Sequence, residues 1–258
     1  GVYVGRERKV ERKKVYFVAD AHLGSRTLED SSANEKLLVE WLETIKKDAL
    51  EVYFLGDMLD FWFEYKHVVP KGFIRFFGKV AELADEGIAI HWFVGNHDLW
   101  MKDYFVKELK ISIHKEPLSK EIMGKHFFLA HGDEFLGKYD RGYKFLRSVF
   151  HNKVMQWLFS WIHPDISIGF ALWWSKSNRE NPERKQVKKE YQLLSLQEYA
   201  REYVKSHSMD YLIFAHIHVL HRENLNEKSQ MIVLGDCMQE LNYGVFDGKK
   251  FLLKKYKE

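Results

Sequence analysis

Six short apolar runs, each ending abruptly in polar residues, constrain the fold of this chain more than any other feature. The runs are rich in β-branched and aromatic residues, which is typical of buried strands. They cover residues 15–19, 52–55, 90–94, 127–130, 211–215 and 231–234. Their length is that of strands rather than helices, so we predict six strands.

Helical patterns separate the first three runs. Segment 34–47 has one apolar stripe, made of Leu37, Leu38, Trp41, Leu42 and Ile45. Ser31 and Ser32 precede this stripe and can cap the helix. Segment 73–86 has the same spacing, and Gly87 follows where a helix-ending glycine belongs. Alternating strands and helices predict an α/β sheet, whose binding site lies beyond the carboxyl ends of the strands.

Residues 137 to about 190 depart from this pattern, because they are rich in Trp and Phe and carry few strand signals. Segment 185–205 then has the spacing of a helix that returns to the sheet. We predict a helical, aromatic-rich insertion above the site, and a small core of its own is the alternative use of these aromatic residues. Residues 1–13 are polar and basic, and we expect them to form a leader before one domain over 14–258.

Composition restricts the class of protein only loosely. The net charge of +3 is too small to argue for a nucleic-acid partner, and we interpret the basic clusters at 6–14 and 184–189 as solvated faces. The single cysteine, Cys237, rules out an internal disulfide and fits a reducing compartment. We find no signal peptide and no membrane-spanning run, so we expect a cytoplasmic protein or one on a membrane surface.

Residues that can bind metals follow five of the predicted strands. The motifs are Asp20-Ala21-His22, Gly56-Asp57-Met58-Leu59-Asp60, Gly95-Asn96-His97-Asp98, His131-Gly132-Asp133 and His216-Ile217-His218. Carboxylate, imidazole and amide oxygen are common ligands of divalent metals. In extended backbone, residues two apart point to the same side, so both members of an Asp-x-His or His-x-His pair can reach one site. Each motif alone is weak, but five in one chain predict a metal site.

In this order the motifs resemble the signature of calcineurin-like metallophosphoesterases, from residue 14 to about 236. The resemblance implies a four-layer α/β/β/α sandwich and two divalent metal ions. It implies the following ligands: Asp20, His22, Asp57 and His218 for one ion, and Asp57, Asn96, His131 and His216 for the other. Ala215 stands where many members have glycine, and the added methyl group is a small change.

A two-metal site implies hydrolysis of a phosphate-containing bond. Ions roughly 3.5–4 Å apart lower the pKa of a shared water and neutralise charge that builds on the phosphate. The resemblance implies that His97 stabilises the transition state or protonates the leaving oxygen, and that Asp98 orients it. Asp60 is expected to hold a ligand or His97 in place. Turn or cap formation is the alternative for Asp60 and Asp98.

Residues 56–62, 134–143 and 150–153 narrow the resemblance to the UDP-2,3-diacylglucosamine pyrophosphohydrolases of lipid A biosynthesis, in a Bacteroidetes-type branch. This implies hydrolysis to UMP and 2,3-diacylglucosamine 1-phosphate, with Mn²⁺ as the usual metal and Fe or Zn as alternatives. The aromatic insertion would then bind acyl chains and hold the enzyme at the cytoplasmic face of the inner membrane. Positions that match head-group contacts are Asp140, Tyr143, Ser175, Lys176 and Asn178.

Other functions stay open, because the best-known branch of that family has Arg where this chain has His97. Another nucleotide, a phosphate monoester or a nucleic acid is the first alternative. A nuclease would need a basic groove studded with aromatic residues, whereas the aromatics here lie in an apolar insertion. A non-catalytic binding module on the same fold is the second alternative, but it would be expected to have lost a ligand or His97.

Overall fold

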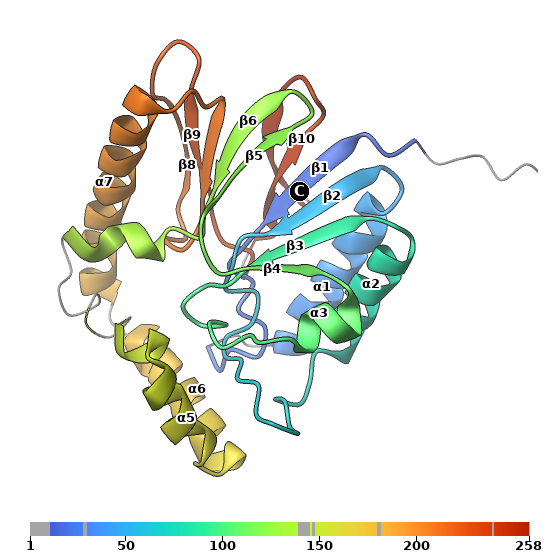
Figure 1. Ribbon diagram of the computed structural model, residues 1–258, viewed down its shortest axis with the longest axis vertical. Coiled ribbons are helices and arrows are strands. Elements are labelled where there is room, and N and C mark those ends of the chain that lie inside the picture. The colour runs from blue at the N-terminus through green and yellow to red at the C-terminus, as the bar shows by residue number, and fades with distance from the viewer. Residues whose placement is uncertain are drawn as a thin grey trace, which may run out of the picture.

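The protein is a sandwich of two β-sheets with helices on both outer faces. The computed structural model describes residues 11–27, 30–138, 145, 148–179, 182–238 and 240–257. The two sheets pack face to face, and helices cover the outer face of each (Figure 1). The α/β/β/α architecture predicted above is confirmed.

The first sheet has six strands. They are β1 (Lys14–Val18), β2 (Ala49–Phe54), β3 (Ala89–Phe93), β4 (Ser112–His114), β10 (Asn242–Phe246) and β11 (Phe251–Lys255). Their order is β11-β10-β1-β2-β3-β4. Strands β1 to β4 run parallel to one another, whereas β10 and β11 form an antiparallel edge.

The second sheet has five strands. They are β5 (Leu118–Ile122), β6 (Lys125–Leu129), β7 (Tyr211–Phe214), β8 (Leu220–Asn224) and β9 (Gln230–Leu234). Their order is β5-β6-β7-β9-β8, with a parallel centre of β6, β7 and β9 and an antiparallel strand at each edge. The six predicted strands correspond to β1, β2, β3, β6, β7 and β9, and β4, β5, β8, β10 and β11 were not predicted.

Helices cover the sheets on the outside. They are α1 (Ser31–Ile45), α2 (Ile74–Asp85), α3 (Tyr104–Leu109), the 3-10 helix η1 (Asp133–Lys138), α5 (Lys153–Ser160), α6 (Pro164–Arg179) and α7 (Pro182–Ser206). The cap of α1 differs from the prediction, because the Asp30 side chain accepts a hydrogen bond from Ala33 N. Ser31 is instead the first residue of α1, and its hydroxyl accepts a hydrogen bond from Gly24 N.

The interface between the sheets is apolar and rich in aromatic rings. Phe17 on β1 stacks on Phe127 on β6, with ring centroids 5.8 Å apart, and both side chains are fully buried. Burying such a side chain contributes about 1.5–3 kcal/mol to folding. This interface fixes how the two sheets sit against each other, and therefore where their strand ends meet.

Helices α5 and α6 extend away from the sandwich as an arm, which lies below the sheets in Figure 1. They belong to the predicted insertion at about 137–190. Its start falls partly outside the described residues, as does most of the predicted leader. Many large apolar side chains of the arm are exposed, among them Trp157, Trp161, Ile166, Phe170 and Trp173. Helix α5 has no buried residue, so its aromatic residues do not form a closed core within the part of the chain that the structure describes.

No helix among the described residues combines the length and the apolar character that a bilayer crossing requires.

A polar cluster at the edge of the sandwich links the two sheets. Glu51 on β2 accepts hydrogen bonds from Lys120 on β5 (2.8 Å), from the Tyr53 hydroxyl (2.7 Å) and from His91 (3.1 Å). Burial acts to raise the pKa of Glu51, but the hydrogen bonds from His91, Lys120 and Tyr53 outweigh it and lower the pKa from 4.5 to about 2.

This shift predicts a pH-dependent stability. A depressed pKa in the folded state stabilises the protein above the unfolded value of 4.5, and that contribution is lost as the pH falls toward 2. We expect Glu51→Gln to lower the free energy of unfolding by about 2 kcal/mol at pH 6, and by much less near pH 3. Urea unfolding across this range measures the difference. The exposed Glu121→Gln on β5 is the control, expected to stay within about 0.5 kcal/mol. If Glu51→Gln lowers the free energy of unfolding by the same amount at pH 6 and at pH 3, the prediction is contradicted.

Candidate active site

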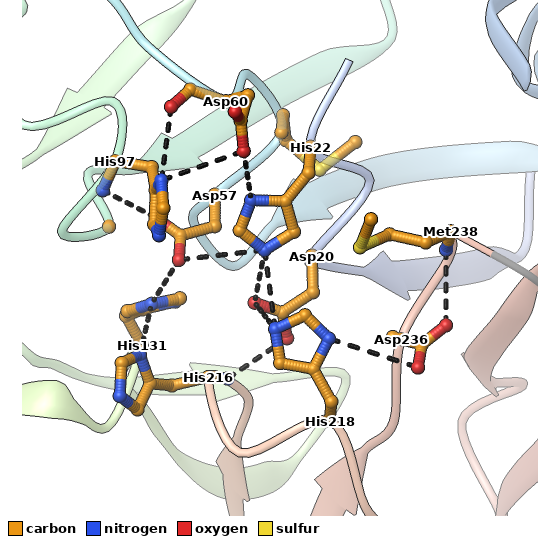
Figure 2. Close-up of polar contacts among 12 residues, drawn as sticks. Asp20, His22, Asp57, Asp60, His97, His131, His216, His218, Asp236 and Met238 are labelled. Carbon is orange, nitrogen blue, oxygen red and sulfur yellow. Dashed lines mark hydrogen bonds and ion pairs between the residues drawn. The ribbon is translucent and has the colours of Figure 1, made fainter. Parts of the chain in front are cut away.

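The predicted metal ligands lie together at one edge of the sandwich, although they are scattered over 200 positions of the sequence. They follow β1, β2 and β3 in the first sheet and β6 and β7 in the second. The carboxyl ends of parallel strands meet at the same edge of a sheet, and face-to-face packing brings the two edges together. Figure 2 shows the side chains converging from both sheets.

One group of ligand atoms is formed by Asp20, His22 and His218. The Nε2 atoms of His22 and His218 are 3.2 Å apart, and both lie within 3.9 Å of Asp20 Oδ1. Ligand atoms about 2.1 Å from a common ion lie roughly 3–3.5 Å from one another. The spacing of this group therefore suits a single cation.

A second group is formed by Asp57, His131 and His216. His131 Nε2 is 3.2 Å from His216 Nδ1 and 3.3 Å from Asp57 Oδ2. His131 Nδ1 donates to the main-chain oxygen of Leu55 at 2.7 Å, which leaves Nε2 to face the group. Asp57 Oδ2 is also 3.8 Å from His22 Nε2, so this carboxylate lies between the two groups. This is the position of a bridging ligand (Figure 2).

The local backbone at the ligands corrects one step of the sequence argument. We expected the paired ligands to project from extended backbone, but Asp20 and His22 have φ values of 55° and 42°, and His216 and His218 have 69° and 53°. These are left-handed conformations, in which non-glycine residues are strained by about 1–3 kcal/mol. The chain turns sharply at each ligand, and this turn brings the side chains of a pair toward the site.

Two buried oxygen atoms test whether the residues fit metal ions. Asp20 Oδ1 and Asn96 Oδ1 are buried and have no hydrogen-bond partner. An unsatisfied buried polar atom costs about 1–3 kcal/mol, and more when it is charged. A cation beside each oxygen would satisfy it, and carboxylate, amide oxygen and imidazole are suitable donors. The residues therefore fit the two divalent ions that the motifs imply.

Burial and mutual charge set the protonation of the site. Burial lowers the pKa of His216 to about 3, so its ring is neutral at pH 7 and can bind a cation without losing a proton. Burial likewise raises the pKa of Asp20 to about 6. For the pair of His131 and Asp57, mutual attraction outweighs burial, raising the pKa of His131 and lowering that of Asp57. His216 could thus bind a cation directly, whereas His131 would release a proton on binding one.

His97 and Asp60 lie beside the ligands. His97 Nδ1 donates to the main-chain oxygen of Asp60 at 3.0 Å, and its ring meets the His22 ring edge-on, with centroids 4.7 Å apart. The Asp60 carboxylate lies 3.3 Å from His22 Nδ1 and 3.6 Å from His97 Nδ1. Asp60 therefore contacts both a predicted ligand and the predicted catalytic histidine.

The Asp98 carboxylate has different hydrogen-bond partners from those expected from the sequence. We expected Asp98 to orient His97, but its carboxylate accepts hydrogen bonds from Gly95 N at 2.7 Å, Met58 N at 2.9 Å and Trp92 Nε1 at 3.2 Å. These bonds tie the loop after β3 to the loop after β2. Asp98 thus holds two loops together, and the contact that orients His97 comes from Asp60.

Of the residues matched to head-group contacts, Ser175 lies next to the site. It is buried on α6, and its hydroxyl donates to Asp60 Oδ2 at 2.9 Å. Lys176 is exposed on the same helix. Asp140 and Tyr143 lie outside the described residues, and so does the side chain of Asn178.

The sequence argument missed Asp236. This residue follows β9, and its Oδ2 lies 3.8 Å from His218 Nδ1, where Figure 2 shows it behind the ligand. Its Oδ1 accepts a hydrogen bond from Met238 N at 3.1 Å. A sequence signal was present, because Gly235-Asp236 follows a predicted strand in the same way that Gly56-Asp57 does.

Two adjacent cation sites with a carboxylate between them, at the joined edges of two sheets, define a metal-dependent hydrolase. The family model for calcineurin-like phosphoesterases matches residues 13–220. This chain belongs to that family, which depends on divalent metals.

Several relatives are similar over nearly the whole chain. The UDP-2,3-diacylglucosamine hydrolase of Porphyromonas gingivalis is 40% identical, and the match covers 96% of this chain and 99% of the relative. The enzymes of the same name from Aeromonas salmonicida and Haemophilus influenzae are 26% and 28% identical, and the matches cover 87% of this chain and 86% and 90% of those relatives.

Close packing around Asp57 and His131 requires two glycines. A Cβ atom on Gly95 would lie 2.1 Å from Asp57 Oδ1, and one on Gly56 would lie 2.4 Å from His131 Nδ1. We expect Gly95→Ala to displace Asp57 and to weaken Mn²⁺ binding by about 10- to 100-fold in a calorimetric titration.

Gly78→Ala is the matched control for this substitution. Gly78 lies within α2, and a Cβ there would meet no heavy atom within 4 Å. Its replacement should raise the free energy of unfolding by about 0.5–1 kcal/mol and leave Mn²⁺ affinity unchanged. Unchanged Mn²⁺ affinity in Gly95→Ala would show that Asp57 does not need its observed position.

Proposed function

We propose that this protein hydrolyses the pyrophosphate of UDP-2,3-diacylglucosamine, releasing UMP and 2,3-diacylglucosamine 1-phosphate. The observation that carries the proposal is the similarity to the UDP-2,3-diacylglucosamine hydrolase of Porphyromonas gingivalis. The two sequences are 40% identical, and the match covers nearly all of both chains. His97 in place of the Arg of the best-known branch is compatible with this activity, because an imidazole can also contact a phosphate oxygen and transfer a proton to it.

The arm supports a lipid substrate. Trp157, Trp161 and Phe170 are each more than half exposed on α5 and α6, and burying such side chains against acyl chains is favourable. We propose that this surface binds the acyl chains and lies at a membrane surface, at the cytoplasmic face of the inner membrane. The same feature disfavours a nuclease, whose groove would be lined with cations rather than with an apolar surface.

The two metal ions would supply Lewis acidity that activates water and neutralises phosphate charge. One would be held by Asp20, His22, Asp57 and His218, and the other by Asp57, Asn96, His131 and His216. We propose Mn²⁺, because it is the usual metal of the enzymes that the motifs resemble, and carboxylate and amide oxygens suit it. Metal analysis of the purified protein distinguishes it from Fe and Zn.

His97 would act directly on the substrate. Because Nδ1 donates to Asp60 O, Nε2 is the nitrogen that faces a substrate oxygen, where it stabilises the transition state or protonates the leaving group. Asp60 keeps the ring in this orientation, and Asp98 keeps the loop that carries it in place. Lys176 on α6 would pair with the negative charge of the substrate. Asp140, Tyr143 and Asn178 would form hydrogen bonds with its head group.

The activity is tested with UDP-2,3-diacylglucosamine and Mn²⁺, with products identified by mass spectrometry. We expect the wild-type protein to release UMP and to leave single-stranded DNA intact. His97→Ala should lower kcat by about 10²- to 10⁴-fold while the protein keeps its metal, because His97 is not among the proposed ligands. If His97→Ala turns over the lipid at the wild-type rate, the proposed role of His97 is wrong. Degradation of the DNA in place of the lipid would favour a nuclease.

Membrane association is tested by sedimentation with vesicles of phosphatidylethanolamine and phosphatidylglycerol. Replacing Trp157 and Trp161 with Gln removes two exposed rings of α5, and we expect vesicle binding to fall at least about tenfold. The control replaces Ile74 and Val106 with Gln, because these exposed apolar residues lie on α2 and α3, away from the arm. If both double variants lose vesicle binding equally, the arm is not the surface that binds the membrane.

A further inference from the structure

A buried hydrogen bond joins the arm to the active site. The Ser175 hydroxyl on α6 donates to Asp60 Oδ2 at 2.9 Å, across 115 positions of the sequence. Both side chains are at least 96% buried, with 4% of Ser175 and 2% of Asp60 exposed. Because the bond is buried, water cannot easily replace it. Loss of the Ser175 hydroxyl should therefore shift the Asp60 carboxylate.

Asp60 uses its other groups to hold two residues of the active site. Oδ1 lies 3.3 Å from Nδ1 of the metal ligand His22, and the main-chain oxygen accepts from Nδ1 of His97. A carboxylate behind a metal-bound histidine fixes the ring orientation and raises the affinity of that ring for the ion. Asp60 is thus the residue through which a contact from the arm reaches both a ligand and the catalytic histidine.

Other contacts hold the arm, and Phe150 just before α5, against the loops after β2 and β3, but they end at other residues of those loops. The Tyr65 hydroxyl and Ser167 are hydrogen-bonded to each other, and Trp100 Nε1 donates to Phe150 O at 2.8 Å. Tyr65 follows Asp60 in the loop after β2, and Trp100 follows His97 in the loop after β3. These contacts fasten the arm, whereas the bond from Ser175 ends at a residue that touches the ligands.

We infer that Ser175 is a positioning residue, which sets the orientation of His22 and His97 through Asp60 and thereby couples the arm to the metal site. This deepens the proposed function, since the arm is where we place the lipid. It also gives Ser175 a role different from the direct head-group contact that the resemblance implies. A direct contact would affect the lipid substrate alone, whereas a positioning role affects the metal site with any substrate.

The test uses two probes that carry no acyl chain: Mn²⁺ alone, and the small diester bis(4-nitrophenyl) phosphate. Ser175→Ala should weaken Mn²⁺ binding by about three- to tenfold, less than the loss of a residue that touches the ligand directly. It should lower kcat for the small diester by about tenfold while KM stays the same. In an Asp60→Ala background, Ser175→Ala should cause no further loss, because the two residues act as one unit.

The matched control is Ser167→Ala, which removes another buried hydroxyl from α6 whose hydrogen bond ends at Tyr65. We expect this variant to keep wild-type Mn²⁺ affinity and diester turnover. Equal losses in both variants would overturn the inference, because the effect would then belong to attachment of the arm. Wild-type Mn²⁺ affinity in Ser175→Ala would overturn it as well, and a change confined to KM for the lipid would assign Ser175 to the substrate. If wild-type protein releases no UMP from the lipid while the Mn²⁺ effect is present, the proposed function fails and the positioning role stands.

Discussion

The Asp57 carboxylate lies between two sets of imidazole and carboxylate groups, and most of the local structure serves to hold it there. His97 N donates to its Oδ1 at 2.8 Å, Gly95 leaves it room, and His131 faces its Oδ2. Carboxylates and imidazoles buried this close together are costly unless cations compensate them. Bound cations would compensate these charges and would satisfy the oxygens of Asp20 and Asn96 that have no hydrogen-bond partner.

The sandwich creates this site by joining the edges of two parallel sheets. Neither sheet has the full set of proposed ligands. Asp20, His22, Asp57 and Asn96 follow strands of the first sheet, and His131, His216 and His218 follow strands of the second. The aromatic interface between the sheets therefore contributes to metal binding, although it lies away from the ions. The arm adds an apolar surface whose contacts end on the loops that carry Asp60 and His97.

Much of the fold could be predicted because its central strands are fully buried. Strands such as β1 and β7 are continuous apolar runs, which are recognisable without knowledge of their partners. Edge strands were missed because their residues alternate between exposed and partly buried positions, as in β8. In a strand of five residues, this alternation is too short to distinguish a strand from a loop by sequence alone. The cap of α1 was assigned to Ser31 and Ser32 rather than Asp30 because several adjacent residues are capable caps, and only the backbone geometry distinguishes them.

The sequence by itself determined which residue types lie at the strand ends, and the chemistry of those residues indicated a metal site. The tertiary structure decided how they are connected. Asp20, His22, Asp57, His216 and His218 have left-handed backbone conformations. Asp98 ties two loops together, and Asp236 lies 3.8 Å from His218. It also decided that Ser175 reaches Asp60. The physical reason is that the type of a side chain determines what it can bind, whereas hydrogen bonds between residues far apart in the chain depend on how the two sheets and the arm pack.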